Sequence, residues 1–461
     1  MRFSELSCLF DGQRDLDHPT AIIGEHVVPF RQFARGVASV AALAKAHGGG
    51  RWLLASEDTW DFAVGLFGLL RAGCSVAIPP NHLPATLGRM QSEVDGILTD
   101  GAVGAGESWH TLPEPGASLP ELSPLADGIV EFWTSGSTGE AKCLRKRLSQ
   151  LNAEVTVLEQ IFGASFEGGP VLGTVPHQHI YGCLFRVLWP LAAGRPFVSE
   201  QCADPDRFRS VMARSLAPAL VCSPALLARL PEMVDLDHYA TGVSAVFSSG
   251  GPLKAADAIA WRRWVPSGVA EIYGSTETGG IAWRVQSEDP DSCHWTPFPD
   301  VALAFETDGA LRVQSPRVGP EPVRMEDAAQ SLPDGRFRLL GRLDRIVKLE
   351  EKRVSLPELE GALEAHPWVS RAAVVPLPQP RPILGAAIVL AREVPHLLPA
   401  DRRQLSQVLR RHLALRFEPV AIPKRWRFVD ELPYNERGKL SHQALAALFA
   451  PQGAEPGVPG C

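Results

Sequence analysis

Alternation of helical and extended segments near the N-terminus is the feature that most constrains how this chain can fold. Apolar residues recur at spacings of three and four over Val37–Ala46 and Thr59–Ala72, which predicts two helices, and Gly73 follows as a C-terminal stop. Short apolar or β-branched runs at Ser75–Ile78 and Ile97–Thr99 predict strands. Strands that alternate with helices form mostly parallel sheets covered by helices, so we predict an α/β fold.

A change in charge marks a predicted domain boundary near Arg342. Residues 342–461 contain 18 Lys and Arg against 13 Asp and Glu, a net +5, whereas residues 1–341 carry a net −12. The second part has strand-like runs at 371–375, 386–390 and 426–429. We therefore predict a large N-terminal domain, 1–341, of mixed and parallel sheets covered by helices. A small α+β domain, 342–461, would follow and end in a disordered tail at about 451–461.

One predicted helix of the small domain has an apolar stripe and an arginine-rich remainder. The stripe consists of Leu405, Val408, Leu409, His412, Leu413 and Phe417. Arg402, Arg403 and Arg410 fall off this stripe. We expect them to form a basic surface.

Composition and charge exclude several classes of protein. The chain has 461 residues, of which 45% are hydrophobic and 21% charged, as in soluble globular proteins with a sizeable core. Its net charge of −7 argues against a protein that coats nucleic acid or anionic membrane. The longest apolar run, Phe62–Leu70, is too short for a membrane span, and the N-terminus lacks a secretion signal, so we expect a cytoplasmic protein. Eight cysteines without a CxxC pair predict neither a zinc site nor a disulfide framework.

The string TSGSTGEAK at residues 134–142 is the most informative motif. Its hydroxyl and glycine residues offer many hydrogen-bond donors with little steric bulk, and a lysine follows them, as wrapping a polyphosphate requires. The spacing differs from the GxxxxGK of a Walker loop. Taken alone, the string could also be a turn without a ligand.

This string resembles the phosphate loop of the adenylate-forming superfamily, which includes acyl- and aryl-CoA ligases, peptide-synthetase adenylation domains and luciferases. Further segments are similar to the family's motifs and follow in the family's order. They are PHQHIYG at 176–182, SSGGPL at 248–253, IYGSTE at 272–277, MEDAAQSLPDG at 325–335, GRLD at 341–344 and PYNERGK at 433–439. Ordered matches across most of the chain are far more specific than any single motif.

The resemblance implies a role for each matching residue. Tyr273 would stack on adenine, Thr276 would hydrogen-bond the α-phosphate, and Glu277 would hold Mg²⁺. Lys439 would bridge the substrate carboxylate and the α-phosphate as negative charge develops between them. The implied catalytic residues are Lys439, Thr276, Glu277 and His179. The implied nucleotide-binding residues are Thr134, Ser135, Gly136, Ser137, Thr138, Gly139, Lys142, Ser249, Gly250, Gly251, Tyr273, Gly274, Ser275, Asp327 and Arg342.

Other interpretations of three of these features stay open. The family's histidine lies beside its acyl pocket, but His177 and His179 could also be a satisfied core or surface pair, or an HxH metal pair that lacks a third ligand. The turn at 248–253 could be an ordinary tight turn. Asp327 could be a solvated surface carboxylate.

The resemblance also implies a mobile small domain, with Asp344 as its hinge. The sequence departs from the family at two places. Met325-Glu326-Asp327 stands where the family has TGD, and Glu351 replaces a glycine that lets a pantetheine arm pass. The second departure concerns transfer of the acyl group to a thiol rather than its adenylation.

The reaction that the resemblance implies is ATP- and Mg²⁺-dependent ligation of a carboxylic acid. The carboxylate would attack the α-phosphorus and release pyrophosphate, and the acyl-AMP would pass to a phosphopantetheine thiol on coenzyme A or an acyl carrier protein. The basic small domain and Glu351 favour an acidic carrier protein. Chain size and loosened motifs resemble the aryl-acid ligases of bacterial pigment and aryl-polyene pathways, which implies a hydroxybenzoate- or cinnamate-like acid.

Three alternatives remain. An enzyme that activates an amino acid would need an acidic group for the amine, and no suitable aspartate appears near His177–Gly182. An oxygen-using luciferase-type enzyme shares all of these motifs. A non-catalytic AMP- or ATP-binding regulatory protein would fit Met325-Glu326 and Glu351, whereas Lys439 and Glu277 argue against it.

Overall fold

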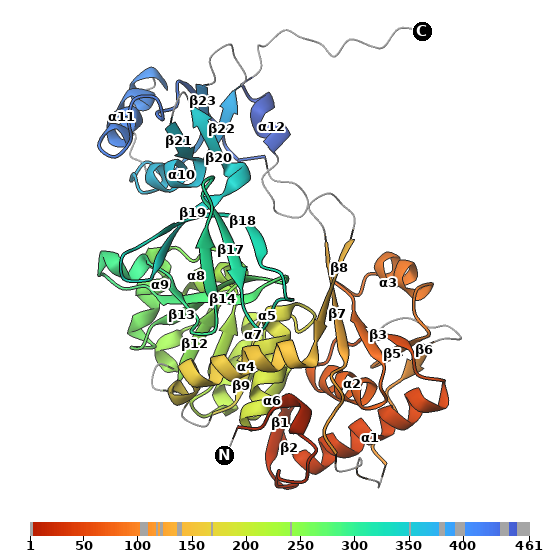
Figure 1. Ribbon diagram of the computed structural model, residues 1–461. Coiled ribbons are helices and arrows are strands. Elements are labelled where there is room, and N and C mark those ends of the chain that lie inside the picture. Colours follow the sequence, from red (N-terminus) through yellow and green to blue (C-terminus); the bar gives the residue numbers. More distant parts are fainter. Residues whose placement is uncertain are drawn as a thin grey trace, which may run out of the picture. The chain divides into compact units, whose positions relative to one another are not determined.

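The computed structural model describes residues 3–101, 109–116, 119, 123–135, 141–166, 169–239, 242–349, 352–377, 383–391, 402–433 and 442–449. The chain forms two compact units (Figure 1). Each unit has its own hydrophobic core. Unit 1 comprises Met1–Ala304, Arg312–Val323 and Leu332–Phe337; unit 2 comprises Phe305–Leu311, Arg324–Ser331 and Arg338–Cys461. Within the described ranges, every helix is too short or too polar to cross a bilayer.

Unit 1 contains a six-stranded sheet with the order β6-β5-β3-β4-β7-β8. Its strands are β3 (Arg51–Ala55), β4 (Ser75–Ile78), β5 (Gly96–Thr99), β6 (Trp109–Thr111), β7 (Ile129–Ser135) and β8 (Ala141–Arg147). Neighbouring strands are parallel except for the antiparallel pair β7 and β8. Helix α1 (Phe30–Ala46) precedes β3, α2 (Thr59–Arg71) connects β3 to β4, and α3 (Pro84–Gln91) connects β4 to β5. The predicted strand at 75–78 is confirmed, and the one at 97–99 begins one residue earlier.

The two predicted helices of this region are confirmed, with two shifted boundaries: α1 begins earlier than predicted, and α2 ends at Arg71 rather than Ala72. Asp58 caps α2, because its side chain accepts hydrogen bonds from two backbone N–H groups of the first turn. Gly73, with φ +84°, continues the chain beyond α2 in the left-handed conformation that terminates helices. Helix α1 begins at Phe30 rather than Val37, because Phe30 and Phe33 extend its buried face at helical spacing.

The second sheet of unit 1 has nine strands in the order β15-β14-β13-β12-β11-β9-β10-β1-β2. Its strands are β1 (Pro19–Ile23), β2 (His26–Pro29), β9 (Val171–Gly173), β10 (Phe197–Gln201), β11 (Ala219–Cys222), β12 (Ala245–Ser248), β13 (Val269–Ser275), β14 (Gly279–Val285) and β15 (Thr296–Pro297). The six central strands, β13, β12, β11, β9, β10 and β1, are parallel to one another. The flanking strands β2, β14 and β15 are antiparallel to their neighbours. The helices of this part are α4 (Leu148–Phe162), α5 (Ile180–Gly182), α6 (Trp189–Ala193), α7 (Pro205–Arg214), α8 (Pro224–Met233) and α9 (Ala255–Ala260).

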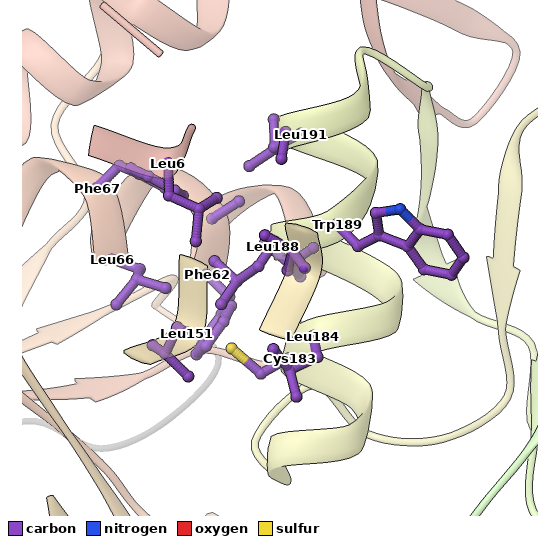
Figure 2. Close-up of a cluster of buried hydrophobic side chains, with 14 of the residues drawn as sticks. Leu6, Phe62, Leu66, Phe67, Leu151, Cys183, Leu184, Leu188, Trp189 and Leu191 are labelled. Carbon is purple, nitrogen blue, oxygen red and sulfur yellow. The ribbon is translucent and has the colours of Figure 1, made fainter. Parts of the chain in front are cut away.

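A continuous apolar core joins elements of both sheets in unit 1. Figure 2 shows side chains from α2, from α4 and from the helical segment that follows β9 packed together. They include Phe62, Leu66, Phe67, Leu151, Cys183, Leu184 and Leu188, each at most 2% exposed. Because the helical segment 183–191 is packed in this core, it fixes the position of the adjoining residues 175–182.

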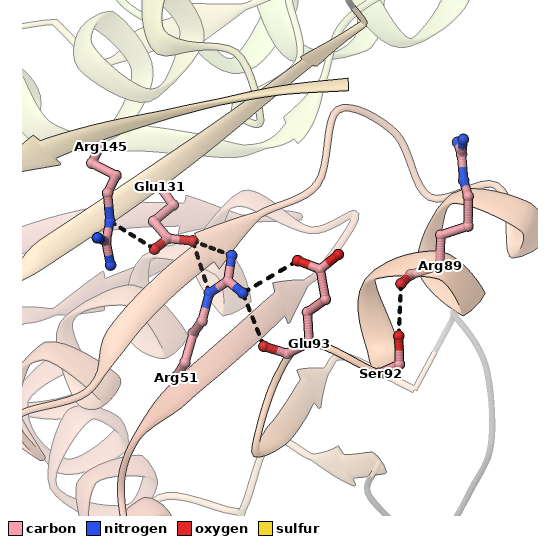
Figure 3. A network of polar contacts seen from close by, with 6 residues as sticks. All are labelled: Arg51, Arg89, Ser92, Glu93, Glu131 and Arg145. Atoms are coloured by element: carbon pink, nitrogen blue, oxygen red, sulfur yellow. Dashed lines mark hydrogen bonds and ion pairs between the residues drawn. The ribbon is translucent and has the colours of Figure 1, made fainter. Parts of the chain in front are cut away.

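An ion-pair network around the buried Glu131 connects three strands of the six-stranded sheet (Figure 3). Arg51 of β3 donates two hydrogen bonds to Oε2 of Glu131 on β7, at 2.9 and 2.6 Å. Arg145 of β8 donates to Oε1 of the same carboxylate at 3.1 Å. Arg51 also donates to the backbone oxygen of Glu93 at 2.9 Å. Glu131 is 1% exposed, so the network fixes the two strands that flank residues 136–140.

A four-stranded sheet has the order β16-β17-β18-β19, and the division between the two units falls within its strands. They are β16 (Ala302–Phe305), β17 (Ala310–Gln314), β18 (Val323–Ser331) and β19 (Phe337–Arg342). The domain boundary near Arg342 stays a prediction.

The remainder of unit 2 is a small α+β body. It contains the antiparallel pair β20 (Ile346–Leu349) and β21 (Lys352–Ser355), and the sheet β22 (Val369–Leu377), β23 (Ile383–Leu390) and β24 (Arg425–Phe428). Its helices are α10 (Leu356–Glu364), α11 (Arg402–Ala414) and α12 (His442–Ala447). The three predicted strands lie within β22, β23 and β24, except that β24 ends one residue before the predicted end. Together the two units confirm the predicted α/β class with mixed sheets; the predicted tail at 451–461 lies outside the described residues.

Candidate active site

A cavity of about 450 Å³ opens in unit 1 where parallel strands end. Strands β9, β11, β12 and β13 all point their carboxyl ends toward it, which is where ligands bind in sheets of this kind. Its lining residues are Glu154, Val175, Pro176, His179, Ile180, Tyr181, Gly182, Leu184, Phe185, Ser223, Ser249, Gly250, Ile272, Gly274, Ser275, Thr276, Gly279 and Gly280. The cavity therefore collects segments from α4 to β14.

Six residues that the sequence nominated line this cavity together. They are His179, Ser249, Gly250, Gly274, Ser275 and Thr276. Ser249 is fixed because its hydroxyl donates to the backbone oxygen of Ile272 at 2.9 Å. Gly251 and Tyr273 are not among the lining residues; the Tyr273 ring instead lies 5.5 Å from the ring of Trp295, centroid to centroid.

The turn between β13 and β14 presents Thr276 and is held by reciprocal hydrogen bonds. The backbone N–H of Ser275 donates to Oγ1 of Thr278 at 3.1 Å, and the N–H of Thr278 donates to Oγ of Ser275 at 3.3 Å. A side chain at Gly274 would come within 2.1 Å of the backbone oxygen of Gly279, so the strands can approach this closely only with glycine there. The turn is therefore a rigid platform.

Glu277 of this turn forms an ion pair with a lysine of the predicted phosphate-loop segment. Nζ of Lys142 lies 2.7 Å from Oε1 of Glu277. Partial burial by itself raises the pKa of Glu277, but hydrogen bonds from Lys142 and Ser275 and the Lys142 charge outweigh that effect, so the pKa lies below its ordinary value. The carboxylate is thus held in its ionised form.

Behind the turn lies a charge cluster, buried except for Asp300, that sequence reasoning missed. We call Lys146, Glu154, Asp300 and Arg317 the turn-support cluster. Nζ of Lys146 donates to the backbone oxygens of Glu277 and Arg317 at 2.6 and 2.7 Å. Arg317 donates to the backbone oxygen of Gly280 and to Oδ1 of Asp300, both at 2.5 Å.

Glu154 completes the cluster from helix α4. Its Oε1 accepts a hydrogen bond from the N–H of Gly280 at 2.6 Å. One signal for Glu154 was present in the sequence, because it falls on the apolar face of α4 among Leu151, Val155 and Leu158. An acidic residue on a buried helix face calls for a specific partner.

The two histidines of PHQHIYG differ in position. His177 is 1% exposed and lies outside the cavity, with Nε2 at 2.9 Å from the backbone oxygen of Ser56 and Nδ1 at 3.2 Å from Oγ1 of Thr59. Burial, followed by the charge of Arg186, lowers the pKa of His177 to about 3. His179 lines the cavity. The satisfied-core interpretation therefore applies to His177, whereas a role of His179 at the acyl pocket stays a prediction.

Other nominated residues belong to elements that do not line the cavity, or fall outside the described residues. Thr134 is on β7, where its hydroxyl donates to the backbone oxygen of Lys142 at 3.4 Å, and the backbone of Ser135 ends the same strand. Asp327 is on β18, Arg342 ends β19, and the backbone of Asp344 lies in the helical turn Leu343–Arg345. Arg342 forms an ion pair with Glu326. Outside the described residues lie Gly136, Ser137, Thr138, Gly139, Glu351 and Lys439.

Comparison with known proteins connects this geometry to a family. Residues 91–314 match the model of the AMP-binding enzyme family, and residues 358–439 match the model of the AMP-binding enzyme C-terminal domain. A 4-coumarate–CoA ligase of Cereibacter sphaeroides is 31% identical over 314 residues, which are 67% of this chain and 69% of that protein.

Solved structures share the fold over nearly the whole chain. ATP-bound MatB from Rhodopseudomonas palustris superposes with a TM-score of 0.77 at 21% identity, over 96% of this chain and 97% of that one. The o-succinylbenzoate CoA synthetase of Bacillus subtilis, in complex with its acyl-adenylate intermediate, superposes with a TM-score of 0.74 at 17% identity, over 99% and 100%. The chain therefore belongs to the AMP-binding family of adenylate-forming enzymes and is an acid ligase.

Proposed function

We propose that this enzyme activates an aryl carboxylic acid with ATP and transfers the acyl group to a phosphopantetheine thiol. In the first step a carboxylate oxygen attacks the α-phosphorus of ATP, the bond to the β-phosphate oxygen breaks, and pyrophosphate leaves. In the second step the thiol sulfur attacks the acyl carbon, the thiol proton is lost, and AMP leaves. Two of the relatives are named 4-coumarate–CoA ligases, and these names support both steps.

The observation that carries the proposal is the composition of the cavity. One side is apolar and aromatic, with Ile180, Tyr181 and Phe185, and the Tyr181 and Phe185 ring centroids are 4.9 Å apart. The other side is the β13–β14 turn with Thr276, next to the Lys142–Glu277 ion pair. A flat apolar acid can bind the first side while its carboxylate approaches a nucleotide at the second.

The turn supplies groups suited to a charged transition state. The hydroxyl of Thr276 can donate to an α-phosphate oxygen, and the platform holds it in place without reorganisation. Mg²⁺ is bound in many nucleotide sites by one carboxylate plus phosphate oxygens, and the ionised Glu277 fits that pattern. Mg²⁺ held there would neutralise phosphate charge. Lys439 is assigned to the same transition state by its motif.

For the acceptor we propose a carrier protein rather than free coenzyme A. Arg402, Arg403 and Arg410 are exposed on α11, as the helical stripe predicted, and the buried side of that helix contains Leu405, Leu409 and Leu413. A basic face attracts an acidic partner. Coenzyme A, which the names of the relatives favour, is the competing acceptor.

Acid-dependent pyrophosphate release tests the first step. We expect release with ATP, Mg²⁺ and hydroxybenzoic or hydroxycinnamic acids, and little with fatty acids or amino acids. Lys439→Ala should lower the rate about 100-fold or more, the effect of removing one preorganised charge. Lys424→Ala, a change of an exposed lysine in unit 2, is the matched control and should keep the rate. Normal release by Lys439→Ala would contradict the assignment.

Salt and charge reversal test the acceptor. Loading of a pantetheinylated carrier protein should weaken as salt rises and in the double variant Arg402→Glu/Arg410→Glu. The matched double variant Arg89→Glu/Arg229→Glu changes exposed arginines of unit 1 and should load normally. Efficient transfer to coenzyme A without carrier loading at low salt would refute the preference for a carrier.

A further inference from the structure

Glu154 is a buried carboxylate on the wall of the substrate cavity. Its side chain is on α4, the residue is 3% exposed, and it is one of the cavity-lining residues. Removing an acidic side chain from water is costly unless its oxygens find hydrogen-bond donors. The donors around Glu154 therefore decide what this group is for.

Only half of this carboxylate is satisfied within the described part of the chain. Oε1 accepts the hydrogen bond from the N–H of Gly280, and Oε2 accepts none from the described residues. The nearby cations direct their polar atoms elsewhere. Nζ of Lys146 donates to two backbone oxygens, and the two terminal nitrogens of Arg317 donate to Gly280 and Asp300.

Glycine allows the carboxylate to reach the cavity. At Gly279, which has φ +66°, a side chain would lie 2.3 Å from Oε2 of Glu154. At Gly280 a side chain would lie 3.2 Å from Oε1. The backbone thus leaves room beside both oxygens, and Oε2 keeps its capacity to accept a hydrogen bond from a bound molecule.

Two hydroxyl groups of the cavity wall already have partners, whereas His179 is a further polar group on that wall. The Tyr181 hydroxyl donates to the backbone oxygen of Cys222 at 3.3 Å, and the Ser249 hydroxyl donates to Ile272. Ile180, Leu184 and Phe185 add apolar surface. Glu154 is therefore an acceptor set against apolar walls, and such a site discriminates strongly between ligands with and without a matching donor.

Charge selects a neutral donor over an ammonium group. Lys146 and Arg317 balance Glu154 and Asp300, so the turn-support cluster is neutral and an ammonium group would add a third cation. Burial raises the pKa of Glu154 despite Arg317, the Gly280 N–H and Lys146. A neutral hydroxyl group adds no charge to the cluster.

We propose that Glu154 determines substrate specificity by accepting a hydrogen bond from a hydroxyl group on the aryl ring of the acid. This inference rests on the proposed aryl-acid ligase function. An amino-acid-activating enzyme would need an acidic group in the cavity for the amine of its substrate. Under this proposal, Glu154 binds a hydroxyl group instead.

The test compares acids that differ only in the donor. Pyrophosphate release is measured with monohydroxy benzoic and cinnamic acids and with their fluoro counterparts, since fluorine is small and cannot donate. In the unmodified enzyme we expect at least one hydroxy acid to exceed its fluoro counterpart in kcat/KM by about 10- to 100-fold. In Glu154→Gln, which keeps an acceptor for the Gly280 N–H, the ratio should fall to about threefold or less.

A matched control separates specificity from support of the turn. Glu159→Gln makes the same change on the same helix, where Glu159 pairs with Arg195 away from the cavity, and should keep the hydroxy-to-fluoro ratio. Since each ratio is internal to one variant, a general loss of activity cancels. The ratio of the unmodified enzyme is informative even if Glu154→Gln fails to fold.

Three results would overturn the inference. Equal use of hydroxy and fluoro acids by the unmodified enzyme would refute it while leaving the aryl-acid function intact. A preference for amino acids or aminobenzoic acids over the hydroxy acids would assign Glu154 to an amine. Failure of every aryl acid, with release from another class of acid, would refute the proposed function as well.

Discussion

Two lysines of strand β8 contact the same glutamate, and their substitution should have very different costs. Lys142 and Lys146 are four residues apart, so both point to the same face of the strand. Lys142 pairs with the Glu277 carboxylate and its side chain is 60% exposed. Lys146 binds the Glu277 backbone oxygen and is 5% exposed. Substituting the two lysines thus compares an exposed ion pair with a buried ammonium group at the same β13–β14 turn.

The expected magnitude for Lys146→Met follows from its two hydrogen bonds. Each hydrogen bond from a charged donor contributes about 1.5–3 kcal/mol, so the loss of both amounts to about 3–6 kcal/mol. Burial lowers the pKa of Lys146, because the charged ammonium group is desolvated in the native state. Methionine carries no charge, so the variant avoids this desolvation cost, which offsets part of the loss. We therefore expect a net loss of about 3 kcal/mol. Lys142→Met should cost at most about 1 kcal/mol, as exposed pairs do.

Urea unfolding monitored by tryptophan fluorescence measures both variants. Nine of the eleven tryptophans lie in unit 1, so the signal reports the unit that contains both lysines. The midpoint should fall markedly for Lys146→Met and little for Lys142→Met, with unchanged slopes. Equal midpoints for the two variants, or a loss below about 1 kcal/mol for Lys146→Met, would refute the reasoning about the buried ammonium.

Three further predictions concern pH, a glycine and the hinge. Burial, followed by Asp58 and other nearby carboxylates, raises the pKa of Asp61 to about 6, so the native state binds this proton more tightly and stability falls as pH rises from about 4 through 6. Asp61→Asn should therefore leave stability unchanged near pH 4 and raise it by about 1–2 kcal/mol above pH 7, allowing for solvent screening. A stability difference that does not vary with pH in thermal melts would contradict this. Gly279→Ala should lower the free energy of unfolding by about 2 kcal/mol or more and lower activity, because the new side chain would meet Glu154. Gly335→Ala is the control: Gly335 has φ +86° but open space around it, so only the backbone cost should appear. Equal losses of stability in urea unfolding would contradict the contact with Glu154. Asp344→Pro should keep pyrophosphate release but lose thioester formation, because proline fixes φ; equal loss of both half-reactions would argue against a hinge.

Local patterns in the sequence were sufficient for several elements of the fold and for the family. Helix α2 and strand β4 follow from apolar spacing and the glycine stop at Gly73, because secondary structure repeats over a few residues and its signals lie within them. The motifs between 134 and 439 indicated the adenylate-forming family, which the comparisons confirm. Short motifs also located the turn at Thr276 that lines the cavity.

Tertiary structure alone decided which residues share the site and in what state. Glu154 meets Gly280 across 126 residues of sequence, and no local period connects a carboxylate on a helix with a glycine on a distant strand. Packing also separated His177, buried behind the cavity, from His179, two residues later and on its wall. It likewise distinguished Lys146 from Lys142, which are identical in type and direction but not in exposure. Burial and long-range approach set the desolvation cost and the hydrogen-bond partners of each group, and these depend on the folded chain as a whole.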